Sequence, residues 1–182
     1  MRRNASWVTA AVVSVPMLAL AVAWAGQENV AYPDGYQTAF VRIATRDRPD
    51  RDPPIVRFFY VNAEALAAAR PGEPLPDGTV AVMEDHPATL GPDGAPLTDA
   101  NGRFVPTAEI TNVFVQEKRA GWGAEYPPEL RNGEWEYAWF EPSGARKEGR
   151  TMDACFECHA GVADTDYTFI TVPFVAQVKG GS

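Results

Sequence analysis

The stretch IVRFFYV, residues 55–61, decides the fold, because β-branched and aromatic side chains fill all but one of its positions. Such a run predicts a strand. Residues 79–85 (TVAVMED), 109–118 (EITNVFVQEK) and 134–140 (EWEYAWF) predict three more strands, and residues 39–45 predict a strand or a short helix. Sixteen prolines and fifteen glycines predict short elements joined by turns. We therefore expect an α+β fold that is mainly β, an antiparallel sheet with a few short helices.

The helices predicted from the sequence are few. Residues 62–70 predict a short helix with Asn62 as its N-cap, and residues 151–161 predict another with Thr151 as its N-cap. Residues 86–103 predict a long loop that begins at His86, and residues 167–175 (YTFITVPFV) predict a last extended segment. On the strand at 134–140, alternation places Trp135, Tyr137 and Trp139 on one face, which would serve a core or a dimer contact equally well.

Both cysteines of the chain lie in CFECH, residues 155–159. In an exported protein this C-x-x-C-H pattern is typical of a c-type haem attachment site near the C-terminus. Cys155 and Cys158 would bond the two vinyl groups of one haem, and His159 would be the proximal iron ligand. A disulfide or redox thiol pair is the main alternative. A zinc site is another, although His86 is the one further histidine and the spacing is not a zinc pattern.

The side chain across the iron would separate an electron carrier from a ligand-binding protein. Met83, His86 and Met152 are the candidates, and Met152 is held on the proximal side by its closeness to Cys155. We expect His86 to be an exposed loop histidine and Met83 to pack in the core.

Arg57 interrupts the apolar face that Ile55, Phe59 and Val61 form in residues 55–61. An arginine on such a face needs an anionic or hydrogen-bonding partner. A haem propionate or an iron-bound ligand would supply one. An edge-strand arginine that reaches solvent is the alternative, and the pattern does not decide between them.

The N-terminus predicts export. Arg2 and Arg3 precede an uncharged run over residues 7–25, and AWAG at residues 23–26 predicts signal-peptidase cleavage after Ala25. An uncleaved membrane anchor is the alternative. We expect residues 1–25 to be a signal peptide, residues 26–182 to form one domain, and the protein to reside in the periplasm. The net charge of −8 argues against nucleic acid as a partner.

Four segments in order resemble the cytochrome P460 and cytochrome c′-beta family: YPDGY (32–36), IVRFFYV with GEPLPDGTVAVME (72–84), NGEWEYAWF (132–140), and CFECH followed by DTDYTFI (164–170). The resemblance covers roughly residues 32–175. It implies a mainly antiparallel β fold with one haem c, often a homodimer, and His159 as proximal ligand. It also implies a vacant or water-filled sixth site and a distal-pocket role for Arg57.

Two departures from the family pattern bear on activity. Met83 stands where hydroxylamine-oxidising members carry a lysine cross-linked to the porphyrin, and a thioether cannot form that bond. The distal carboxylate of those enzymes falls near Val113 and Phe114, and the nearest acids in sequence are Glu109 and Glu117. An apolar distal wall with an arginine is similar to the nitric-oxide-binding c′-beta branch, with Phe114 as the candidate distal cap.

The sequence therefore predicts a periplasmic monohaem c-type cytochrome that binds a small diatomic such as nitric oxide, with Arg57, Met83 and Phe114 in the haem pocket. An electron-transfer cytochrome, or a redox subunit of a larger complex with a redox partner protein, is the first alternative. An oxidoreductase for hydroxylamine or a nitrogen oxide is the second. Enzymatic activity stays undecided, and the missing lysine counts against it.

Overall fold

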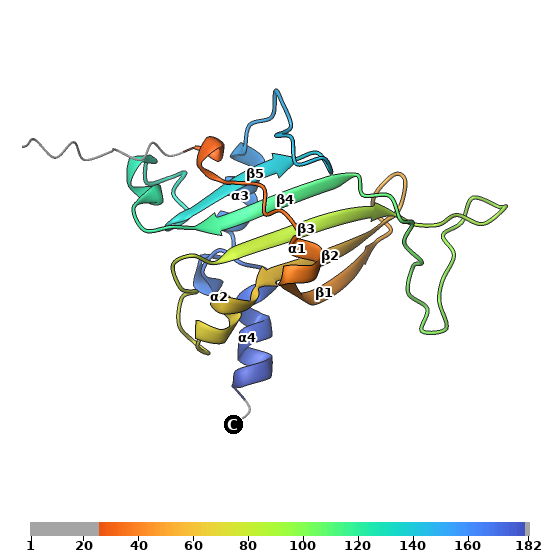
Figure 1. Ribbon diagram of the computed structural model, residues 1–182, viewed down its shortest axis with the longest axis horizontal. Coiled ribbons are helices and arrows are strands. Elements are labelled where there is room, and N and C mark those ends of the chain that lie inside the picture. Colours follow the sequence, from red (N-terminus) through yellow and green to blue (C-terminus); the bar gives the residue numbers. More distant parts are fainter. Residues whose placement is uncertain (1–25, 181–182) are drawn as a thin grey trace, which may run out of the picture.

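The computed structural model describes residues 26–180, and the predicted signal peptide at residues 1–25 lies outside them. A five-stranded antiparallel sheet forms the body of the protein, with its strands in sequence order (Figure 1). The strands are β1 (Phe40–Arg48), β2 (Ile55–Asn62), β3 (Val80–Pro87), β4 (Asn112–Lys118) and β5 (Trp135–Phe140). The prediction of a mainly β fold with an antiparallel sheet is confirmed.

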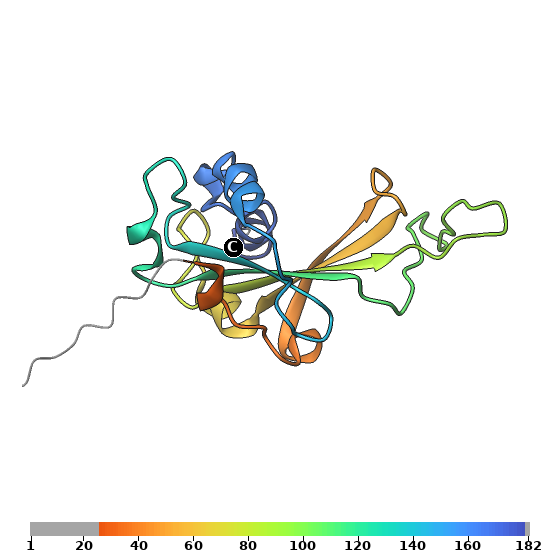
Figure 2. The ribbon, with the colours of Figure 1, turned by 90° about the horizontal axis from the view of Figure 1, so that it is seen from above.

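Short helical segments connect and cover the strands. They are η1 (Gln27–Asn29), α1 (Tyr36–Ala39), α2 (Ala63–Ala68), η2 (Trp122–Glu125), α3 (Asp153–Ala160), η3 (Ala163–Thr165) and α4 (Thr171–Lys179). Seen from above, α3 and α4 lie on one face of the sheet, and η1 and α1 lie on the other (Figure 2). Within residues 26–180, no helix is long and apolar enough to cross a membrane.

The face that carries η1 and α1 is a closed core. Side chains at alternate strand positions meet Val30 and Tyr36 from the N-terminal segment, and both of these are fully buried. The strand residues in this core are Tyr60, Val82, Val113, Val115, Ala138 and Phe140. Burial of each large apolar side chain contributes roughly 1.5–3 kcal/mol, so this face holds the sheet in register.

The opposite face is partly covered by α3 and α4, and this is where the predicted haem site lies. Trp135 and Tyr137 are buried beneath α3, together with Met152 and Phe156. The aromatic face of residues 134–140 is therefore core at Trp135 and Tyr137, whereas Trp139 is only half-buried.

Two local predictions were wrong. Residues 171–179 form helix α4 instead of continuing an extended segment, and Pro173 fits because it stands in the first turn, where no amide donor is needed. The N-cap of α3 is Met152 instead of Thr151. The β-branched residues of 171–179 favour a strand. In helix α4, however, Val172 and Val175 gain apolar contacts, and these outweigh the propensity.

Candidate functional site

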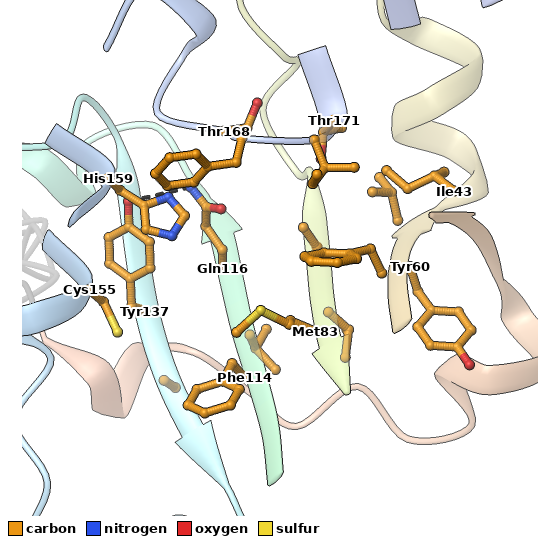
Figure 3. A pocket seen from close by; sticks show the side chains of 18 residues that line it. Ile43, Tyr60, Met83, Phe114, Gln116, Tyr137, Cys155, His159, Thr168 and Thr171 are labelled. Atoms are coloured by element: carbon orange, nitrogen blue, oxygen red, sulfur yellow. Dashed lines mark hydrogen bonds between the residues drawn. The ribbon is translucent and has the colours of Figure 1, made fainter. Parts of the chain in front are cut away.

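A cavity opens between the sheet and the chain that follows α3 (Figure 3). It holds about 670 Å³ of space, a figure that includes the open solvent at its mouth. Its lining is mainly apolar. The lining includes Phe59, Met83, Phe114, Gln116, Tyr137, Cys155, His159 and Phe169.

Helix α3 carries the three residues of the predicted attachment motif. Cys155 lines the cavity and is half-buried, while Cys158 is exposed and lies outside the lining. Both are free thiols, and no disulfide joins them. Burial raises the pKa of the Cys155 thiol, and the nearby Cys158 adds to this effect, so Cys155 is protonated at neutral pH.

His159 is held in one orientation by the backbone. Its Nδ1 donates to the carbonyl oxygen of Tyr167 at 2.7 Å, and its ring packs against the Tyr137 ring with centroids 4.9 Å apart. Within residues 26–180, Nε2 has no hydrogen-bond partner, and the ring lines the cavity. Burial lowers the pKa of His159, although the Tyr167 hydrogen bond opposes this. A neutral imidazole with Nδ1 engaged and Nε2 open is the form that ligates a metal.

The Tyr167 carbonyl is itself fixed by an unusual backbone. Asp166 and Tyr167 adopt left-handed conformations with φ of 50° and 57°, which few residues other than glycine adopt. The Asp166 carboxylate accepts from Lys118 Nζ at 2.8 Å and from the Leu75 amide at 2.8 Å. Gln116 Nε2 also donates to the Tyr167 carbonyl at 3.0 Å. This strain sits where the histidine is oriented, as expected of a functional site.

A second set of contacts fixes α3 on the sheet. Asn132 is 1% exposed, and its Nδ2 donates to the Phe156 carbonyl and to the Tyr137 hydroxyl, each at 3.0 Å. The Phe156 ring packs edge-on against Tyr137, with centroids 4.8 Å apart. The motif therefore lies on a helix whose position is set by buried polar and aromatic contacts.

Neighbouring strands supply the sheet wall of the cavity. Phe59 pairs with Met83, and Met83 pairs with Phe114, so these three side chains lie side by side on one face. Met83 and Phe114 point into the space that His159 also lines (Figure 3). Met83 therefore lines the cavity. This agrees with the pocket position predicted from the family pattern and not with the core packing expected from the strand alone.

Arg57 lies on the same sheet face but not among the lining residues. Its Nε and Nη2 donate to the two carboxylate oxygens of Asp85 at 2.6 and 2.8 Å. Its guanidinium carbon is 5.9 Å from the centroid of the Phe114 ring, so it borders the wall of the cavity. The partner that an arginine on an apolar face requires is thus a protein carboxylate. Among the described residues, Nη1 makes no hydrogen bond.

The prediction that His86 is an exposed loop residue was wrong. His86 lies in β3 on the face away from the cavity and is 8% exposed. Its Nδ1 donates to the Thr107 carbonyl at 3.0 Å, and its Nε2 faces Glu84 Oε1 at 2.6 Å. Both partners are acceptors, so the ring donates from both nitrogens. Its position prevents His86 from serving as a sixth iron ligand, or as a zinc ligand beside His159.

The acids near the supposed distal position also point away from the cavity. Val113 and Glu117 belong to the opposite face, where Glu117 pairs with Arg119 at 2.7 Å, and Glu109 is exposed. The acid that does share the cavity face is Asp85, two residues beyond Met83. Sequence reasoning missed Asp85, although the alternation of residues 79–85 would have placed it beside Arg57.

Gln116, Tyr137 and Phe169 are further lining residues that sequence reasoning did not assign to the haem pocket. The same alternation indicates the first two, since Gln116 follows Phe114 on its face and Tyr137 opposes Gln116 across β4 and β5. Phe169 carries no such signal. It packs edge-on against His159 at 5.2 Å and is 48% exposed, so it stands at the mouth.

These residues fit a covalently attached haem. An apolar cavity, a buried thiol on its wall and an imidazole nitrogen open to it are the parts such a group needs. Residues 33–170 match the family model described as Cytochrome P460. No curated protein matches the chain in sequence.

Proposed function

The chain belongs to the cytochrome P460 family, and from that premise we propose that it is an exported monohaem c-type cytochrome that binds a small neutral ligand such as nitric oxide. The family implies a covalently bound haem c. In our proposal Cys155 and Cys158 bond the haem, and His159 Nε2 ligates its iron. The iron of a haem held there supplies the centre to which the small ligand binds.

The observation that carries the ligand-binding proposal is the apolar sheet wall. Phe59, Met83 and Phe114 line it, and the charged pair of Arg57 and Asp85 lies outside the lining. An apolar wall admits a neutral diatomic without desolvation cost and disfavours charged ligands. Arg57 Nη1, which Asp85 leaves unpaired, is the donor that we propose for a bound ligand.

An electron carrier is the alternative that a specific residue favours. Met83 points its thioether into the cavity. Of the residues predicted as a sixth iron ligand, it is the one whose position in the structure still allows that role. Methionine and histidine together ligate the iron of many electron-transfer cytochromes. Hydroxylamine oxidation has less support, because no lysine lines the described cavity and Asp85, the acid on the same sheet face as Met83, is paired with Arg57.

Optical spectra of the purified haem protein, oxidised and reduced, test the proposal. We expect a high-spin spectrum that changes when carbon monoxide or nitric oxide is added, and we expect Met83→Ala to leave the spin state unchanged. A low-spin spectrum that neither gas alters, and that Met83→Ala converts to high spin, would establish the electron carrier instead. Turnover of hydroxylamine with an added electron acceptor would instead support the hypothesis that the protein is a hydroxylamine oxidoreductase.

The remaining elements of the proposal concern the surroundings of the protein. The leader-like residues 1–25 support export to the periplasm, and the family resemblance supports a homodimer. A redox partner protein belongs to the electron-transfer alternative. Sedimentation of the exported protein tests the dimer. Recovery in the periplasmic fraction, rather than with membranes, tests cleavage against an uncleaved anchor.

A further inference from the structure

The backbone nitrogen of Gly26 meets a buried carboxylate. Gly26 N lies 3.1 Å from Glu136 Oε1, and the other oxygen of Glu136 accepts from the Tyr126 hydroxyl at 2.9 Å. Glu136 lies on β5 and is 0% exposed. A carboxylate so deeply buried is costly unless a charge or several donors compensate it.

A second carboxylate converges on the same glycine. A Cβ added at Gly26 would collide with the carboxylate of Glu28, so Glu28 lies directly against this residue. Within residues 26–180, neither Glu28 nor Glu136 takes part in an ion pair, although Arg146 attracts Glu28 at longer range. Burial raises the pKa of Glu136 to about 7, and the Glu28 charge adds to this. Two acids thus surround one neutral amide.

Neighbouring charged groups make no ion pair with these two acids within the described residues. Glu117, the neighbour of Glu136 across β4 and β5, pairs with Arg119 at 2.7 Å. Arg146 acts on Glu28 only at longer range, and its Nη2 donates to the Val30 carbonyl at 2.6 Å. Among the described residues, Glu28 and Glu136 therefore have no cation in ion-pair contact, and both lie against Gly26.

We propose that Glu136 and Glu28 form a binding site for the α-ammonium group of a chain processed between Ala25 and Gly26. Hydrolysis of that peptide bond consumes one water, leaves a carboxylate on Ala25 and frees an amine on Gly26, which takes up a proton. The former amide donor then becomes a cation with three donors beside two carboxylates. The inference rests on the predicted cleavage after Ala25 and is independent of the haem chemistry.

The site explains what the first described residues do. Gln27 Nε2 donates to the Arg150 carbonyl at 3.1 Å, and Val30 and Tyr36 enter the core beyond it. An ion pair at Gly26 would lock this segment onto β5. Glycine suits the position because a side chain there would meet Glu28. Processing would thus complete the fold as well as release the protein from its leader.

The test uses the exported, haem-loaded protein, with its N-terminus identified by mass spectrometry. The protein is labelled with ¹³C-glycine, which leaves the α-amine and its three donors unmodified, and the titration of that amine is followed by NMR at Gly26 Cα. We expect its pKa to lie well above the ordinary α-amino range, to fall towards that range in Glu136→Gln, and to stay high in Glu64→Gln, an exposed control. An ordinary pKa, no response to Glu136→Gln, or a mature N-terminus other than Gly26 would overturn the proposal.

If the Glu136→Gln protein does not fold, a second measurement tests the proposal without that variant. A leader with its cleavage site moved upstream leaves two extra residues before Gly26 and keeps Glu136. We expect its thermal midpoint to be lower than that of the mature protein by roughly 2–8 °C, while its response to carbon monoxide stays unchanged. Equal midpoints would overturn the proposal, and a lost gas response alone would bear only on the haem function.

Discussion

Substituting Asp85 tests how the cavity face tolerates its buried charges. The side chains of Arg57 and Asp85 are 10% and 5% exposed, and two hydrogen bonds of 2.6 and 2.8 Å join them. Surface pairs contribute about 0–1 kcal/mol, but removing one partner of a buried pair costs about 3–5 kcal/mol. Asp85→Ala leaves the Arg57 guanidinium buried without its counter-ion. We therefore expect a loss of about 3–5 kcal/mol of unfolding free energy.

Such a loss is a large share of the roughly 5–15 kcal/mol that stabilises a typical domain. Urea unfolding of the haem-loaded protein, followed by circular dichroism, would measure it as a lower midpoint at unchanged slope. The matched control is Asp50→Ala, because Asp50 makes the same two-bond pair with Arg48 but is 57% exposed. We expect the midpoint of that variant to equal that of the wild type.

The double variant Arg57→Leu with Asp85→Leu distinguishes the cost of leaving one buried charge unpaired from the net contribution of the ion pair. Replacing both buried charges by apolar groups is often neutral, so most of the lost stability should return. An Asp85→Ala protein within about 1 kcal/mol of the wild type would refute the reasoning, because it would show that water reaches the pair. A double variant less stable than Asp85→Ala would refute it as well.

Two further predictions concern the supports of the site. Asn132→Ala should cost roughly 1–3 kcal/mol and broaden the haem spectrum, because the Phe156 carbonyl and the Tyr137 hydroxyl lose their shared donor; an unchanged urea midpoint would contradict this. Burial lowers the pKa of His86, but hydrogen bonds to Glu84 and Thr107 outweigh this and raise it. The contribution of protonated His86 to the unfolding free energy is therefore complete below the unfolded pKa of about 6.5 and is lost as the pH rises through the raised folded pKa. We expect the urea midpoint of the wild type to fall between pH 6 and 9, and His86→Gln to make that fall smaller.

Runs of β-branched and aromatic residues made much of the fold predictable. Residues 55–61 and 134–140 each place apolar side chains on both faces, and both are strands in the structure. The motif at residues 155–159 indicated the helix that borders the cavity. These signals are local, since they depend on neighbours along one element, and local signals are the ones a sequence displays.

The errors occurred where distant contacts decide the structure. His86 was expected in a loop because Pro87 follows it, but β3 continues through both residues and buries the histidine against Glu84. Residues 171–179 contain β-branched side chains, yet packing against the cluster around Trp135 makes them a helix. The left-handed Tyr167 that orients His159 had no sequence signal, because it is not a glycine.

The structure of β3 shows how one strand separates two tasks. Glu84, Asp85 and His86 are consecutive and buried, yet the pleat sends them to alternate faces. On the closed core, Glu84 accepts from His86 and Tyr36; on the cavity face, Asp85 binds Arg57. A shift of one residue in the pairing of β3 would move each of these charged side chains to the opposite face, away from its partner. The charged residues therefore specify the register as the apolar pattern does. Substitutions at Asp85 should therefore alter the cavity, and substitutions at Glu84 or His86 the core behind it.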